Sequence, residues 1–186
     1  MGTSNRVKAT PPARYTATAI ALHWVVAALL VAGIGIGLVM TGLPNGITKL
    51  KLYNWHKWLG ASVLALTLLR LAWRLGHAPP PLPPMAAWQR RAAATLQAAL
   101  YALCLAVPLL GWAYSSALGF PLVWLGVLPL PDWVPQDRAL AQAIKPWHAA
   151  GAWLLVLLAG GHVAAALKHQ WLDRDGLLRR MAPWRR

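Results

Sequence analysis

The sequence predicts an all-α integral membrane protein, a four-helix bundle with up-down-up-down topology that takes in the whole chain, residues 1–186, as one domain. Apolar residues make up 58% of the chain, which contains only four acidic residues, all of them Asp. The apolar residues gather into four long segments, and nearly all Lys and Arg lie in the connections or near the segment ends. This pattern is typical of membrane-spanning helices joined by short loops.

The first two helices are expected over about residues 18–40 and 52–75. His23 lies near the start of the first, which ends at the turn-forming sequence L-P-N-G. His56 lies at the start of the second, and Arg70 lies near its end. A proline-rich connector, residues 79–84, follows and cannot be helical.

The third and fourth helices are expected over about residues 92–114 and 146–169. The third contains Pro108 and has no histidine. Between them lies the longest stretch outside the predicted spans, in which residues 137–144 are expected to form a separate short surface helix. Pro146 suits the first turn of the fourth helix, where a missing N–H costs nothing.

The basic residues predict the orientation of the bundle. With both termini in the cytoplasm, the opposite side carries few positive charges, namely Lys49, Lys51, Lys57, Arg138 and Lys145. The positive-inside rule therefore favours two cytoplasmic termini. The formal charge of +14 does not indicate a nucleic-acid partner, because the basic residues are spread over loops and helix ends.

Histidines within the predicted spans are the main candidate functional residues, because ionisable groups in a membrane are costly. His148 and His162 are fourteen residues apart, which places them nearly in phase on one helix, about 21 Å from each other. Since successive helices alternate in direction, His23 falls at the depth of His162 and His56 at the depth of His148. The sequence thus predicts two histidine pairs, one in each leaflet.

The chemistry of such a pair favours haem. Zinc requires about four ligands, and no Cys or carboxylate accompanies either pair. A di-iron centre needs carboxylates within the helices, where this chain has none. Haem needs only two axial ligands from the protein, because the porphyrin supplies four nitrogens. The spacing therefore predicts two haems; the alternative is four ordinary histidines hydrogen-bonded to their neighbours.

Several motifs together carry a family resemblance. They are Arg14-Tyr15 leading to L-H-W at residues 22–24, H-K-W-L-G-A-S at residues 56–62 with Arg70 following, and the His148, His162 and His169 series before D-G-L-L-R-R-M-A-P at residues 175–183. In these motifs the sequence resembles the bacterial cytochrome b561 family of small four-helix, di-haem b-type membrane cytochromes. The resemblance extends over essentially the whole chain.

The resemblance implies a multi-pass protein of the bacterial inner membrane that transfers electrons between two b haems. His23 and His162 would ligate the cytoplasmic haem iron, and His56 and His148 the periplasmic one. Members of the family are linked to quinone, and the family includes a superoxide:ubiquinone oxidoreductase. The implied activity is therefore that of a superoxide:quinone oxidoreductase, with a small periplasmic electron donor and ubiquinone reduced near the cytoplasmic haem.

Three further residues are candidates for contacts with haem on the cytoplasmic side. Arg70 lies at the depth of that haem and is expected to pair with a propionate, because a buried guanidinium needs an anion. Arg14 and Tyr15 are weaker candidates for the same role.

Three more residues are candidates for a part in catalysis. His169, two turns beyond His162, would hydrogen-bond a propionate or a quinone and supply a proton, or else is an interfacial histidine without a ligand. Lys57 and Lys145 flank the outer histidines and would draw in a small anion, or else form part of a solvated rim.

Two arrangements for electron delivery remain open. The chain is either a stand-alone oxidoreductase or a haem-bearing membrane anchor subunit of a dehydrogenase or hydrogenase complex. Its short loops leave little surface for a large partner, so no obligate protein partner is expected. The expected partners are membrane lipid, ubiquinone and the small donor.

Overall fold

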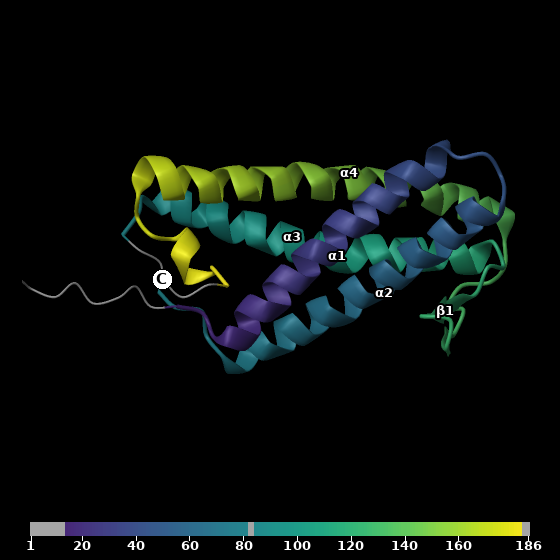
Figure 1. Ribbon diagram of the computed structural model, residues 1–186, viewed down its shortest axis with the longest axis horizontal. Coiled ribbons are helices and arrows are strands. Elements are labelled where there is room, and N and C mark those ends of the chain that lie inside the picture. The colour runs from purple at the N-terminus through teal and green to yellow at the C-terminus, as the bar shows by residue number, and fades with distance from the viewer. Residues whose placement is uncertain (1–13, 82–83, 184–186) are drawn as a thin grey trace, which may run out of the picture.

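Four long helices form the molecule, of which a computed structural model describes residues 14–81 and 84–183. They are α1 (Ala17–Gly42), α2 (Ile47–Gly76), α3 (Ala87–Ala117) and α4 (Arg138–Lys168) (Figure 1). Each belongs to a segment long and apolar enough to cross a membrane. The predicted all-α, four-helix membrane architecture is confirmed.

Neighbours in sequence are neighbours in space. α1 packs against α2, α2 against α3, and α3 against α4, whereas α1 and α4 make few close backbone approaches over the described residues. Val26, Val63, Cys104 and Leu155, one from each helix, form the buried core cluster. Leu155 is seven residues from both His148 and His162 on α4, so this apolar cluster lies between the two histidine levels.

The helices extend beyond their predicted ends, and the largest difference concerns α4. It begins at Arg138, where Asp137 caps it by accepting hydrogen bonds from the backbone N–H groups of Ala139 and Leu140. The expectation of a separate surface helix over residues 137–144 is therefore wrong, as is the start at Pro146. The alanine-rich stretch after Asp137 favours helix, and the helix continues through the proline.

A small antiparallel hairpin, β1 (Leu122–Trp124) and β2 (Leu128–Leu130), lies between α3 and α4 and was not predicted. Three side chains tie it to α2: Lys57 Nζ donates to Pro121 O, Trp58 Nε1 to Val123 O, and Trp124 Nε1 to Ser62 Oγ. The hairpin therefore lies at the end of the bundle opposite residues 14 and 183 (Figure 1).

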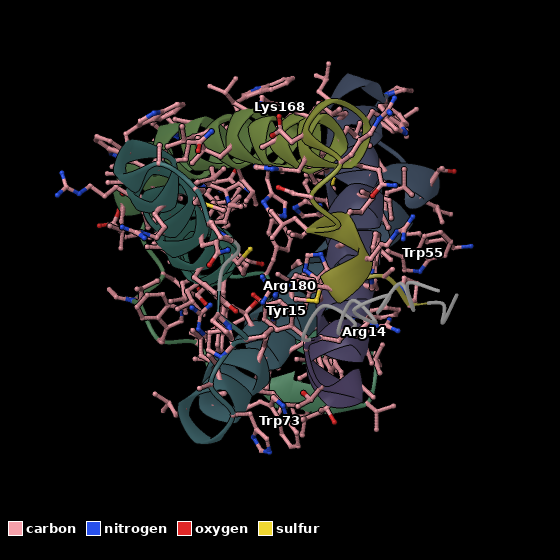
Figure 2. The ribbon with its side chains drawn as sticks, turned by 90° about the vertical axis from the view of Figure 1, so that its left-hand side faces the viewer. Arg14, Tyr15, Trp55, Trp73, Lys168 and Arg180 are labelled. Carbon is pink, nitrogen blue, oxygen red and sulfur yellow. The ribbon has the colours of Figure 1, made fainter. Side chains whose placement is uncertain are left out.

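The other end is closed by the C-terminal segment, which continues from α4 through a π-helical turn, η1 (His169–Asp173), and a 3-10 turn, η2 (Leu178–Arg180). The segment folds back against the start of α1, as the end-on view shows (Figure 2). Arg14 donates to Ala182 O, Tyr15 N to Arg180 O, and Trp24 Nε1 to Met181 O. Residues 14 and 183 thus lie at the same end of the bundle.

Candidate functional site

The outer pair of histidines, His56 on α2 and His148 on α4, face each other with ring centroids 6.1 Å apart. Their Nδ1 atoms lie 2.9 Å from Gly33 O and 3.0 Å from Val107 O. A carbonyl oxygen only accepts hydrogen bonds, so each Nδ1 carries the proton and each Nε2 keeps a free lone pair. This tautomer and a fixed ring orientation are what a metal-ligating histidine requires.

Two glycines make room for these rings. A Cβ atom added at Gly37 would lie 3.1 Å from His56 Cε1, and one added at Gly111 would lie 3.0 Å from His148 Cε1. Both distances are shorter than ordinary van der Waals contacts between carbon atoms. The missing side chains therefore let both imidazoles turn into the space between the helices.

A cavity surrounds the outer pair and is lined by residues of all four helices and by Leu122 of the hairpin. Its walls are mainly apolar side chains, as a porphyrin ring requires. Trp112 also lines it, and its indole Nε1 is buried without a hydrogen-bond partner among the described residues. A buried N–H of this kind is suited to an acidic group of a bound cofactor.

The inner pair, His23 on α1 and His162 on α4, has ring centroids 6.3 Å apart. The charge of Arg70 acts on both rings, so this guanidinium lies close to the pair, as its depth on α2 predicts. The guanidinium also lies over the ring of Tyr101, 5.4 Å from the centroid. The inner pair therefore lies in the field of a guanidinium group.

Both separations fit a metal bound between two imidazoles. A metal–nitrogen bond of about 2 Å, plus about 1.1 Å from that nitrogen to its ring centroid, on each side of the metal gives about 6.2 Å between centroids. The measured values of 6.1 and 6.3 Å agree with this sum. With no carboxylate or thiolate within either pair, the donor set fits six-coordinate haem rather than zinc.

The remaining predicted residues are placed as follows. Arg14 and Tyr15 contact the C-terminal segment at the inner end. His169 begins η1, and its Nδ1 lies 2.6 Å from an Asp175 carboxylate oxygen. Lys57 is half-buried and holds the hairpin, whereas Lys145 is exposed at the outer end.

Two residues were not singled out from the sequence. Trp112 lines the cavity with its Nε1 buried and without a hydrogen-bond partner among the described residues, which composition cannot reveal. Arg180, 5% exposed, is buried where the C-terminal segment meets α1, although it belongs to a basic run that suggests a solvated tail. A Leu-Leu pair before Arg179 and Arg180 was the only available indication of burial.

A membrane four-helix bundle with two facing imidazole pairs defines a protein of the membrane cytochrome type. The sequence model of prokaryotic cytochrome b561 matches residues 14–184. The chain belongs to the prokaryotic cytochrome b561 family. It is thus a multi-pass protein of the bacterial inner membrane, and family membership implies b-type haem and membrane electron transfer.

Individual relatives align over nearly their whole length. Cytochrome b561 homolog 2 of Escherichia coli K12 is 32% identical over 91% of this chain and 92% of its own. Cytochrome b561 homolog 1 of the same organism is 34% identical over 93% of this chain and 99% of its own length. A Yersinia pestis protein named probable superoxide oxidase CybB is 26% identical over 93% of this chain and 98% of its own length.

Proposed function

We propose that this protein carries electrons through two b haems, from superoxide at the periplasmic end to quinone at the cytoplasmic end. The observation that carries the proposal is the presence of two facing histidine pairs at different levels of the bundle, each built from two helices. The similarity to a probable superoxide oxidase supports the choice of donor.

The outer site would be held by His56 and His148. Haem supplies one-electron chemistry, and the protein supplies position and electrostatics. Gly33 O and Val107 O fix both rings and increase their basicity by accepting the Nδ1 protons. Trp112 Nε1 and the Lys57 ammonium, which both line the cavity, are the groups that would receive acidic substituents of the cofactor.

The inner site would be held by His23 and His162, with Arg70 beside them. The positive charge of Arg70 favours an added electron at this site, since it lowers the energy of the reduced state. The outer histidines instead donate hydrogen bonds to backbone carbonyls, which makes them more electron-rich ligands and favours the oxidised state. This asymmetry supports electron flow from the outer site to the inner one.

At the outer end, the exposed lysines Lys51 and Lys145, with the partly exposed Lys49, raise the local concentration of a small anion. Each superoxide anion would give up one electron and leave as oxygen. Two superoxide anions therefore reduce one quinone, which takes up two electrons and two protons to become quinol. The half-buried Lys57 contributes to this field while also anchoring the hairpin.

At the inner end, His169 is the group placed to hold a proton for quinone. Its Nδ1 is fixed by Asp175 at 2.6 Å and by Asp173 at 3.1 Å, so only Nε2 remains for a substrate. Both carboxylates are partly accessible and can exchange protons with solvent. His169, Asp173 and Asp175 would thus position and recharge a proton donor.

The test is the spectrum and activity of the purified protein from haem-replete cells. We expect reduced-minus-oxidised bands of six-coordinate b haem at two haems per chain, and superoxide-dependent reduction of a short-chain ubiquinone. A protein without haem would overturn the proposal. Two haems with no superoxide-dependent reduction, together with an extrinsic dehydrogenase that copurifies stoichiometrically, would favour the anchor-subunit function.

A further inference from the structure

A polar pocket lies where α4 ends, at the same end of the bundle as residues 14 and 183. Its lining consists of Gln170, Trp171, Arg174, Gly176 and Arg179. Two guanidinium groups thus face one small space, and the lining contains no carboxylate. A pocket with this charge is suited to an anion with several oxygens.

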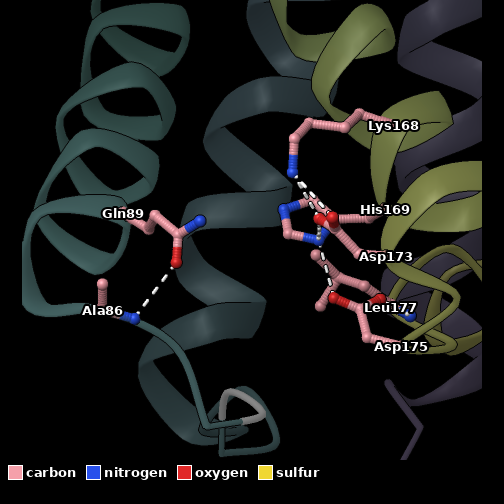
Figure 3. A network of polar contacts seen from close by, with 7 residues as sticks. All are labelled: Ala86, Gln89, Lys168, His169, Asp173, Asp175 and Leu177. Carbon is pink, nitrogen blue, oxygen red and sulfur yellow. Dashed lines mark hydrogen bonds and ion pairs between the residues drawn. The ribbon is translucent and has the colours of Figure 1, made fainter.

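The acidic residues nearest to the pocket are already bound to Lys168 and His169 (Figure 3). Lys168 Nζ lies 2.6 and 2.8 Å from the two oxygens of Asp173, and His169 Nδ1 lies 2.6 Å from Asp175. Asp175 also accepts the backbone N–H of Leu177. Neither Arg174 nor Arg179 has an ion pair with a carboxylate in the part of the chain that the structure describes.

The rest of the chain offers no other acidic side chain to neutralise these two arginines. Its four acidic residues are Asp132, Asp137, Asp173 and Asp175, and the first two lie beside the start of α4, at the opposite end of the bundle. The two guanidinium charges in the pocket therefore call for an anion from outside the protein.

Arg174 lies at the turn that borders the pocket. Arg174 adopts a left-handed conformation with φ 52°, which is unfavourable for a residue with a side chain. Its Nε donates to Trp171 O at 3.3 Å, so its terminal nitrogens remain available. Gly176, with φ 73°, completes the turn on the pocket wall.

The pocket lies at the end of a span that is long enough to reach the lipid headgroups. The span that ends at Asp173 has 36 residues. At about 1.5 Å per residue it is about 54 Å long, which exceeds a bilayer of about 40–45 Å including headgroups. Trp171 and Leu172 in the same turn are 67% and 76% exposed, as expected of side chains that enter the membrane interface.

We propose that this pocket binds the phosphate of an anionic phospholipid headgroup, held by Arg174 and Arg179. One arginine can donate two parallel hydrogen bonds to two oxygens of a phosphate. Basic pockets at the ends of membrane helices attract anionic lipids. A lipid rather than free phosphate is the occupant, because its acyl chains would lie along the exposed side chains of Trp171 and Leu172.

The test uses the haem-loaded protein in non-ionic detergent, with native mass spectrometry to count bound lipid and thermal unfolding to measure stabilisation. Phosphatidylglycerol, phosphatidylcholine and inorganic phosphate are the three probes. For the double variant Arg174→Gln/Arg179→Gln we expect phosphatidylglycerol affinity to fall about tenfold or more. Phosphatidylcholine should bind weakly to both proteins.

The matched control is Arg90→Gln/Arg91→Gln, which removes the same charge from exposed residues at the start of α3, at the same end of the bundle. It should keep the affinity for phosphatidylglycerol. An equal loss in this control would overturn the proposal, as would inorganic phosphate that competes as strongly as the lipid. Arg174→Lys keeps the charge but not the paired donors, so it should bind the lipid less tightly than wild type. This single variant provides the test if the double variant does not fold.

Discussion

The four imidazoles of the outer and inner histidine pairs differ in the groups that surround them. The outer rings are fixed by backbone carbonyls of α1 and α3, helices that do not themselves carry these rings. The inner rings lie near the charge of Arg70 instead. Similar ring separations thus occur in two different electrostatic settings.

The pairing of the histidines leads to a first prediction. His162→Ala and His23→Ala should remove the same haem, because one lost axial ligand leaves an open coordination position. His56→Ala and His148→Ala should remove the other. Haem content and low-temperature difference spectra of the four variants give the answer. His77→Ala is the control, since this exposed ring stacks on Trp73 near the end of α2. Loss of one and the same haem in His162→Ala and His56→Ala would contradict the pairing.

A second prediction concerns the space beside His56. Gly37→Val should displace the ring, because even a Cβ atom there would lie 3.1 Å from it. The outer haem should be lost, so haem content should fall by about half, given one haem per histidine pair. Gly35→Val on the same helix is the matched control, because a Cβ atom at Gly35 meets nothing within 4 Å. Equal haem loss in both variants would point to general destabilisation of α1.

At the level of single elements, the hairpin gives α2 a role beyond carrying His56. Lys57, Trp58 and Ser62 follow that histidine and each bonds the hairpin. The position of His56 and that of the hairpin over the outer cavity are therefore coupled through two turns of α2. Lys57 has a structural role that its charge alone did not suggest.

The third prediction tests this coupling. Trp58→Phe removes the 2.6 Å hydrogen bond to Val123 O and should lower the free energy of unfolding by about 1 kcal/mol. Protease cleavage within the hairpin should also become faster. Trp55→Phe, at a half-exposed position one turn earlier, should change neither measurement. Unchanged cleavage in Trp58→Phe would show that other contacts hold the hairpin.

The continuity of α4 is an element-level result that local sequence did not predict. Proline removes one backbone hydrogen bond, which favours a helix start in isolation. In α4, the cap at Asp137 and the helix-forming residues before Pro146 offset that loss. His148 consequently lies in the third turn of a long helix, where neighbouring helices restrict its backbone.

On the scale of the whole molecule, the two ends of the bundle are closed by different devices. The hairpin covers the outer end, and the C-terminal segment folds over the inner end against Arg14, Tyr15 and Trp24 (Figures 1 and 2). Residues 14 and 183 meet at one end, so the beginning and the end of the bundle share one side of the membrane.

Orientation provides the fourth prediction. The excess of basic residues at the end where the C-terminal segment lies should keep that end in the cytoplasm. A green fluorescent protein fused to the C-terminus should therefore fluoresce, and an alkaline phosphatase fused there should be inactive. A phosphatase inserted in the loop between α1 and α2 should be active. The reverse pattern would place the Lys145 end of the bundle in the cytoplasm. Periplasmic superoxide could then not donate electrons at that end.

The sequence by itself determined the number of spans, their alternation and the two histidine levels. These follow from hydropathy and from the fixed rise and rotation of an α-helix, which are local properties. For the same reason Arg70 could be placed at the depth of His23 and His162. Of the residues predicted at the outer end, His56, Lys57 and His148 line the cavity, whereas Lys145 is not among its lining residues.

Only the tertiary structure decided which groups meet between elements. Some of these contacts join residues that are far apart in the chain: the carbonyls that fix His56 and His148, the glycines beside their rings, the hairpin bound by Trp58, and the buried Arg180. The arginine pocket at the end of α4 is formed by an irregular turn. Backbone carbonyls and glycines carry no side-chain pattern that periodicity can detect. Their role depends on packing geometry, which a helical repeat does not specify.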